Sequence, residues 1–208
     1  LRDPQDSLIA DAFIEDSLFG SVVDENIFPQ GPIQAIAECS AADVPLMTGT
    51  MKDETRLWIL YVPLLADLPF EVVASFLPYA ERAIPEGKTV EDVVDTYQSS
   101  RPGATPGEIM HAAGSDIFFR LPAIRLAEAQ LSHQPNHTFL YRFDWAPPVP
   151  VSPDNDIGAP HGSELTFMFG SGNEGWTDIY GDDPLPQQLT EQMMDAWLAF
   201  AKTGNPNH

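Results

Sequence analysis

Five histidines are the side chains in this 208-residue sequence best suited to proton transfer near neutral pH. They are His111, His133, His137, His161 and His208. His161 lies in residues 158–165, a loop in which neighbouring glycines leave room for a side chain to project into a cleft. We interpret His111 and His208 as packing or surface residues. His161 is therefore the candidate general base.

His133 and His137 raise the question of a metal site, because residues four apart on a helix can ligate one ion. Pro135 lies between them, however, and no carboxylate motif accompanies the pair. We therefore expect no metal at these histidines. No other pattern in the sequence implies a metal or a cofactor.

An acid that could orient His161 is expected where a strand ends. Residues 44–48 are a compact apolar run, and the polar, acidic residues 50–56 follow it. We expect a buried strand that delivers Asp53 and Glu54 to a site. In a serine hydrolase the acid fixes the tautomer of the histidine, which takes a proton from the nucleophile. An acid followed much later by a histidine is the chain order of the α/β-hydrolases.

The elements that must position these residues are also indicated by pattern. Besides the strand at 44–48, we expect a strand or turn at 21–28, a short helix from Pro32, several helices within 57–113, a helix capped by Ser115 or Asp116 that runs to Leu131, a strand at 137–145 and a helix from Thr190 to Gly204. Strands separated by helices indicate an α/β fold with a mostly parallel central sheet flanked by helices.

Composition excludes several classes of protein. With 43% hydrophobic residues the chain can bury a sizeable core. Only 10 lysines and arginines stand against 31 aspartates and glutamates, so a charge of -21 opposes binding to nucleic acid or to an anionic membrane. The apolar stretches are too short and too interrupted to span a bilayer. A single cysteine, Cys39, excludes an internal disulfide and leaves the cellular compartment open.

Three segments carry a family resemblance. They are residues 44–54 (Val-Pro-Leu-Met-Thr-Gly-Thr-Met-Lys-Asp-Glu), 158–165 (Gly-Ala-Pro-His-Gly-Ser-Glu-Leu) and 197–207 (Trp-Leu-Ala-Phe-Ala-Lys-Thr-Gly-Asn-Pro-Asn). In order and spacing they resemble the C-terminal part of a type-B carboxylesterase, the cholinesterase-like family. The resemblance implies that residues 1–208 are the C-terminal portion of a single α/β-hydrolase domain, which is incomplete without its N-terminal portion.

The resemblance also implies roles for individual residues. Glu54 matches the acid of the family's catalytic triad, His161 matches its histidine, and Asp53 is a structural neighbour. Leu57 and Trp58 would lie near the substrate gorge, with a plain core role as the alternative. A further set, Ser115, Asp116, Phe119 and Pro122, resembles a recurrent helix of the family, which we interpret as scaffold.

Some features depart from the family pattern. Thr55 follows the acid where the family usually has glycine, and Met51 stands where asparagine is common. No serine has glycine two residues away on both sides, so the G-x-S-x-G nucleophile motif is missing, as is a glycine-rich oxyanion segment. In the family both lie upstream of this region. We reject Ser163 as a substitute nucleophile because it is too close to His161, and we interpret Glu164, a rival acid, as a partner for a backbone amide or an arginine.

We therefore expect a carboxylic ester hydrolase that acts through an acyl-enzyme on a small-molecule ester. This chain would supply the acid and the histidine, and the N-terminal portion of the same enzyme would be its partner and supply the serine. By itself the chain would be inactive. The main alternative is a non-catalytic protein-interaction domain on the same scaffold. A third reading, an acidic accessory domain without a site, predicts that Glu54 and His161 lie far apart.

Overall fold

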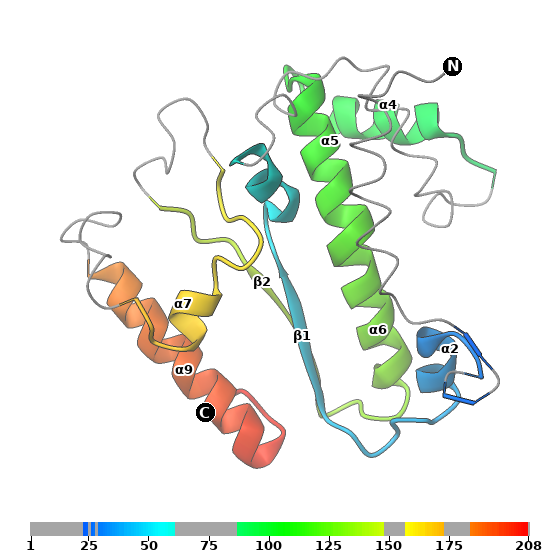
Figure 1. The fold of residues 1–208 in the computed structure, drawn as a ribbon, viewed down its shortest axis with the longest axis vertical. Helices are drawn as coiled ribbons and strands as arrows, with labels where there is room; N and C mark the ends of the chain where they lie inside the picture. The colour runs from blue at the N-terminus through cyan, green and yellow to red at the C-terminus, as the bar shows by residue number, and fades with distance from the viewer. Residues whose placement is uncertain are drawn as a thin grey trace.

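The computed structural model describes residues 23–24, 26–27, 29–60, 87–147, 157–172 and 184–207 (Figure 1). Its elements, in order, are α2 (Pro32–Ala37), β1 (Leu46–Met51), a 3₁₀ helix (Glu54–Leu60), α4 (Val90–Ser100), α5 (Pro106–Ser115), a π-helical turn (Asp116–Arg120), α6 (Leu121–Leu131), β2 (Thr138–Phe143), α7 (Leu165–Met168) and α9 (Leu185–Thr203). Strands thus alternate with helices, as the sequence predicts for an α/β fold.

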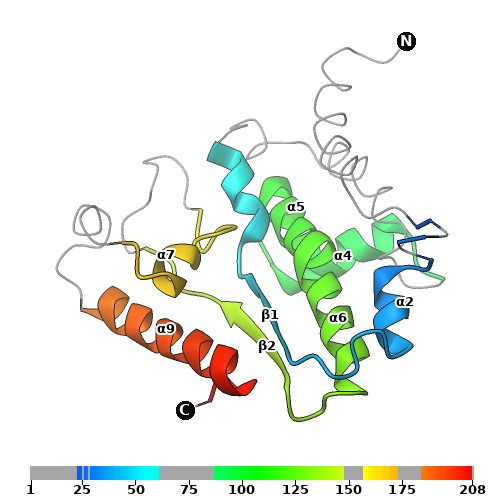
Figure 2. The ribbon, with the colours of Figure 1, turned by 60° about the horizontal axis from the view of Figure 1, so that its bottom comes forward.

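The sheet of the described residues is a parallel pair of strands. β1 pairs with β2 in register from Leu46 opposite Thr138 to Met51 opposite Phe143. Helices α5 and α6 form the crossover between the strands and lie on one side of the pair, whereas α9 lies on the other side (Figures 1 and 2). Both strands therefore end at the same edge, where the loops that follow them meet.

The α9 side of the sheet is packed with aromatic side chains. Phe139 and Tyr141 project from alternate positions of β2 and meet Phe200 and Trp197 of α9 edge-to-face, with ring centroids 6.2 and 5.0 Å apart. Gly49 lies opposite Tyr141 in β1, and a Cβ there would overlap the tyrosine ring. The buried residues of this core are Met51, Phe143, Ala159, Phe167 and Met193.

On the opposite side, the C-terminal end of α6 and the residues just after it bind the segment that enters β1. The amide Nε2 of Gln130 donates to the carbonyl oxygens of Ala41 and Val44 at 2.7 and 2.5 Å. Gln134 donates from its Nε2 to the carbonyl oxygen of Ala42 at 2.5 Å. These bonds satisfy carbonyl groups in a segment that belongs to no helix or strand, and they fix the position where β1 begins.

The strands differ from their predicted bounds only at the ends. β1 begins two residues later than the predicted run at 44–48 and continues to Met51, because β2 offers ladder partners up to Phe143. β2 lies within the predicted 137–145. Of the strand or turn expected at 21–28, the described residues 23–24 and 26–27 form no strand. The chain bends there, and Asp24 Oδ1 accepts from the backbone N–H groups of Asn26 and Ile27 at 2.9 and 2.6 Å.

Two predicted helix starts are wrong. Thr105 caps α5 in a capping box with Glu108, and the helix continues through Ser115 instead of beginning there. Ser115 caps nothing, and a π-helical turn carries the chain from α5 into α6 just before Pro122. α9 begins at Leu185, with a proline at its start, and Thr190 lies inside the helix, where its hydroxyl donates to the Pro186 carbonyl. The predicted start from Pro32 and stop at Gly204 are confirmed.

Residues 61–86, which fall within the predicted helical stretch 57–113, lie outside the described part of the chain. α4 and α5 account for the rest of that stretch, together with the 3₁₀ helix. Among the described residues, no helix combines the length and the apolar character that crossing a bilayer requires.

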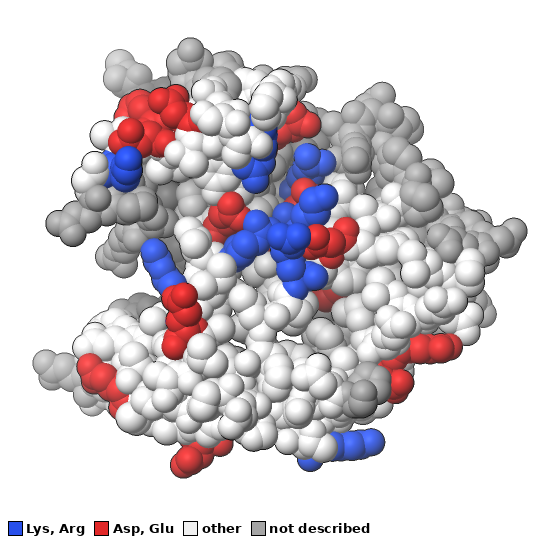
Figure 3. Space-filling view, turned by 180° about the vertical axis from the view of Figure 1, so that it is seen from behind, with Lys and Arg blue, Asp and Glu red and all other residues white. Residues whose placement is uncertain are grey.

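Basic side chains gather in the middle of the face shown in Figure 3, with acidic side chains beside them. Arg142 binds Asp144 with both its Nε and Nη2 at 2.5 Å, and Arg120 pairs with Asp116 one turn earlier in the π-helical turn. Arg120 Nη2 also donates to the carbonyl oxygen of Lys52 at 3.2 Å. This arginine therefore connects the crossover helices to the loop that follows β1.

Candidate active site

Glu54 is the first residue of the 3₁₀ helix, directly after the turn that ends β1, and the residue is buried at 2% exposure. Carboxylate Oε1 accepts from the Met51 backbone N–H at 2.8 Å. Carboxylate Oε2 lies 2.6 Å from His161 Nδ1. Both oxygens are therefore engaged, one by the strand end and the other by the histidine, and the carboxylate has a single orientation.

His161 faces this carboxylate from the loop after β2. Its backbone N–H donates to the Glu54 carbonyl at 3.2 Å, so the two residues are joined by main chain as well as by side chain. The His161 side chain remains half-exposed, and within the described part of the chain its Nε2 has no hydrogen-bond partner. One ring nitrogen is thus held by a buried acid while the other is open to a proton donor.

A second pair of bonds joins the same two loops. The Asp53 backbone N–H donates to the Ala159 carbonyl at 2.9 Å, and Ala159 N–H donates back to Asp53 Oδ2 at 3.1 Å. Gly158 makes this approach possible, because it has φ +61° and a Cβ there would overlap the Asp53 carboxylate. Asp53 therefore binds the histidine loop rather than the histidine itself.

A cluster of three buried polar residues lies next to Glu54, and the sequence analysis did not predict it as part of a site. Thr55, His111 and Ser115 are each at most 4% exposed, and Thr55 binds both of the other residues. His111 was expected to be a packing or surface residue, and the structure places it in the interior. Burial lowers the pKa of His111 to about 4, with a smaller effect from the Arg56 charge, so its imidazole is neutral at pH 7.

Glu164 does not take the place of Glu54. His161 Nδ1 is already bound by Glu54. The buried Oε2 of Glu164 has no hydrogen-bond partner among the described residues, but the carboxyl group accepts a hydrogen bond from the Glu164 backbone amide, one of the two partners expected for it. Burial raises the pKa of Glu164, the hydrogen bond from its own backbone amide partly opposes this, and the nearby Glu54 charge raises it further. Ser163 Oγ is likewise buried and without a partner in the described part of the chain.

Leu57 and Trp58 lie on the 3₁₀ helix, half-buried. The Trp58 ring is 6.0 Å from that of Phe119, which in turn lies 5.0 Å from the His161 ring. Phe119 belongs to the π-helical turn and was assigned to the scaffold, yet it touches the catalytic candidate. Trp58 therefore reaches His161 through Phe119.

The side chains of His133 and His137 do not converge on a common point, because each has its own partners. His133 Nε2 is 3.0 Å from the Ala37 carbonyl, with Nδ1 3.7 Å from Cys39 Sγ, whereas His137 Nδ1 is 3.0 Å from the Gly204 carbonyl. Within the described ranges, no group of three or more histidine, cysteine, aspartate or glutamate side chains is placed to hold a metal.

A parallel sheet between helices, with an acid after one strand and a histidine after the next, defines an α/β-hydrolase arrangement. Solved structures agree. A carboxylesterase from Geobacillus stearothermophilus matches with a TM-score of 0.69 at 27% identity, covering 99% of this chain and 43% of that one. A para-nitrobenzyl esterase structure matches with a TM-score of 0.63 at 28% identity, covering 100% of this chain and 41% of that one. The predicted fold class is confirmed.

The sequence comparisons identify the family. The model of the carboxylesterase family matches residues 3–208, and the chain belongs to this family. It is 34% identical to para-nitrobenzyl esterase of Bacillus subtilis over 192 residues, which are 91% of this chain and 35% of the relative. It is 25% identical to phenmedipham hydrolase of Pseudarthrobacter oxydans, with coverages of 91% and 36%. The chain thus spans about a third of the length of these relatives.

Proposed function

We propose that the protein to which this chain belongs hydrolyses carboxylic esters through an acyl-enzyme, with His161 as general base and Glu54 as the acid of the triad. The observation that carries the proposal is the 2.6 Å contact between buried Glu54 Oε2 and Nδ1 of a half-exposed His161. A carboxylate in this position keeps the proton on Nδ1 and stabilises the imidazolium that forms during turnover.

The proposed reaction uses both nitrogens of the His161 ring. His161 Nε2 accepts the proton of a serine hydroxyl as the serine oxygen attacks the ester carbonyl carbon. The imidazolium then gives this proton to the departing alcohol, and the acyl group stays on the serine. Water, activated by the same Nε2, attacks the acyl-enzyme and releases the carboxylic acid. The serine and the oxyanion donors would come from the N-terminal portion of the enzyme, which would form a single domain with residues 1–208.

The alternatives are less well supported. An acidic accessory domain without a site predicts a wide separation of Glu54 and His161, which is not what is observed. A non-catalytic interaction domain on the same scaffold has no need of a buried carboxylate aligned on a histidine ring. The names of the relatives, a para-nitrobenzyl esterase and a phenmedipham hydrolase among them, also favour an enzyme that acts on small molecules of the ester class.

The substitution H161A in the full-length protein tests the proposal. We expect turnover of a p-nitrophenyl ester to fall by about six orders of magnitude while the circular dichroism spectrum is unchanged. H133A is the matched control, because His133 contacts the Ala37 carbonyl and Cys39 instead of the site. Near-normal hydrolysis by H161A contradicts the assignment.

A fluorophosphonate probe separates the enzyme from the interaction domain. The probe labels an activated serine covalently, so the full-length wild-type protein should be labelled and H161A should not. Absence of labelling in the folded wild-type protein would favour the non-catalytic alternative.

A further inference from the structure

Thr55 is bound to α5 at two points one helical turn apart. Its backbone N–H donates to Ser115 Oγ at 3.3 Å, and its hydroxyl donates to the His111 carbonyl at 2.8 Å. The Thr55 hydroxyl has one proton, which it donates to the His111 carbonyl. Its oxygen is therefore an acceptor toward His111 Nδ1 and Ser115 Oγ, each 3.3 Å away. Main chain and side chain of one residue are therefore both fastened to the same helix face.

Thr55 can come this close to α5 because residue 114 of the helix is a glycine. Gly114 lies next to Ser115, and a Cβ on it would come within 3.1 Å of Thr55 Cγ2. An alanine would therefore push the threonine methyl group away from the helix. The contact is closed to water, since Thr55, His111 and Ser115 are 4%, 4% and 2% exposed.

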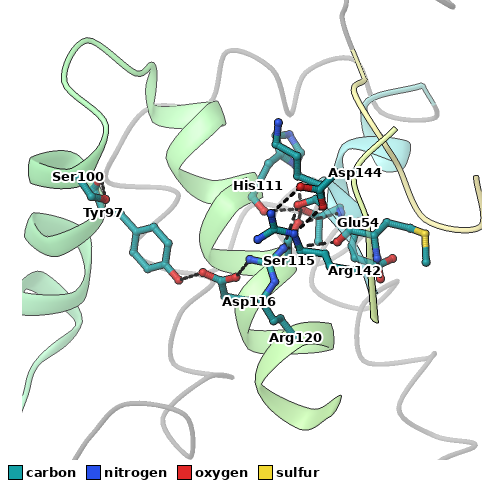
Figure 4. A network of polar contacts seen from close by, with 12 residues as sticks. Glu54, Tyr97, Ser100, His111, Ser115, Asp116, Arg120, Arg142 and Asp144 are labelled. Atoms are coloured by element: carbon teal, nitrogen blue, oxygen red, sulfur yellow. Dashed lines mark hydrogen bonds and ion pairs between the residues drawn. The ribbon is translucent and has the colours of Figure 1, made fainter. Parts of the chain in front are cut away.

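What Thr55 holds is the residue before it. Glu54 is linked to Thr55 by one peptide bond, and its carboxylate bridges the Met51 N–H and His161 Nδ1. Figure 4 shows Glu54 at one side of the polar network that also contains His111 and Ser115. A shift of the backbone at Thr55 would move the carboxylate relative to the histidine ring.

We propose that Thr55 is a positioning residue of the catalytic site, and that His111 and Ser115 of α5 hold it so that Glu54 keeps its alignment on His161. This inference rests on the proposed function, because it takes Glu54 and His161 as the acid and base. The neutral, buried His111 serves as a fixed hydrogen-bonding group here and does not touch the reacting atoms.

The substitution T55V in the full-length protein tests the proposal, because valine keeps the shape of threonine and lacks its hydroxyl. We expect kcat for a p-nitrophenyl ester to fall on the order of 10-fold, with KM changed less than about twofold. T55S restores the hydroxyl and should return kcat to within about twofold of wild type. T203V is the matched control: Thr203 donates to the Ala199 carbonyl at 2.8 Å, at the far end of α9.

A spectroscopic signal reports the alignment without relying on turnover. The proton shared by Glu54 and His161 Nδ1 should give a downfield proton resonance in the wild-type protein, identified by its loss in H161A. We expect this resonance to weaken or move upfield in T55V and to return in T55S. If T55V does not fold, S115A is measured instead, with the same direction of change expected, because it removes the acceptor of the Thr55 N–H and the contact of Ser115 Oγ with the Thr55 hydroxyl.

The two proposals fail in different ways. If T55V or S115A leaves both kcat and the downfield resonance as in wild type, Thr55 is not a positioning residue. If T55S lowers kcat as much as T55V does, the hydroxyl is not what matters, and the inference is again wrong. A wild-type protein without hydrolysis or probe labelling contradicts the proposed function, and the resonance in T55V then decides by itself whether Thr55 aligns Glu54.

Discussion

Glu54 and His161 meet in a site where each residue is held at more than one point. Glu54 is fixed by the Met51 amide and by the histidine, and His161 is fixed by the carboxylate and by the Glu54 carbonyl. Such redundancy keeps a short, charge-assisted hydrogen bond in place even though the histidine ring is half-exposed. The neighbouring backbone groups thus hold the pair to which we assign the chemistry.

His111 makes protein stability depend on pH. Burial holds its pKa at about 4 in the folded protein, against an ordinary value of 6.5. Between these values the unfolded chain binds a proton that the folded chain does not, so the free energy of unfolding falls as the pH drops from about 6.5 to about 4. The full effect is roughly 3 kcal/mol.

Urea unfolding of wild-type protein and H111N at pH 7 and pH 4.5 measures this contribution. Wild type should lose more stability between the two pH values than H111N does, because asparagine does not titrate. Subtracting one pH dependence from the other removes the part due to Glu164 and the other carboxylates. Equal losses in the two proteins would show that His111 is not buried as a neutral group.

At the scale of elements, the site depends on two parallel strands that end side by side. The pairing of β1 with β2 brings the acid loop and the histidine loop to one edge, and the Asp53–Ala159 bonds then join the loops. α9 presses on one side of the strands through Trp197 and Phe200. The crossover helices hold the other side through Arg120, whose guanidinium binds the loop after β1.

Gly49 is the position where strand pairing and helix packing depend on one another. In G49A the new Cβ would overlap the Tyr141 ring, which would have to leave its edge-to-face contact with Trp197. We expect a loss of about 1–3 kcal/mol in the free energy of unfolding, measured by urea titration. G31A is the control, because a Cβ at Gly31 has open space around it. Equal stability of the two variants would mean that the ring shifts without cost.

At the scale of the molecule, we propose that the 208 residues hold one part of a larger arrangement. The chain covers about a third of the length of its relatives, and within its described residues each strand has a single neighbour. A base and an acid without a nucleophile and oxyanion donors have little to act with. Strands with one free edge also invite pairing with other chains.

We therefore expect the purified 208-residue chain to show no hydrolysis of p-nitrophenyl esters above the uncatalysed rate. Co-expression with the N-terminal portion of the protein should restore activity, because it would supply the serine. The full-length protein serves as the positive control, assayed at the same molar concentration. Hydrolysis by the chain at a rate near that of the full-length protein would contradict the division of the site between the two portions.

Local pattern was enough to find several elements and both ends of the candidate pair. An apolar run that ends in glycine and acidic residues predicted the strand before Glu54, and a glycine-flanked loop singled out His161. Gly204, with φ +71°, ends α9 as predicted, because a left-handed residue after a helix is a local requirement. The local pattern did not distinguish Glu54 from Asp53 as the acid, and the family resemblance made that choice.

Tertiary structure decided what surrounds that pair. Thr55 and His111 are 56 residues apart, and Ala159 and Asp53 are 106 apart, so no short-range signal could join them. Ser115 looked like a helix cap because serine favours that position, but its hydroxyl is taken by Thr55, and the helix runs on. The sequence by itself thus determined which residues we propose for the proton chemistry. Only the packing of α5 and the loops against one another decided how those residues are held, since such contacts exist only after distant segments have come together.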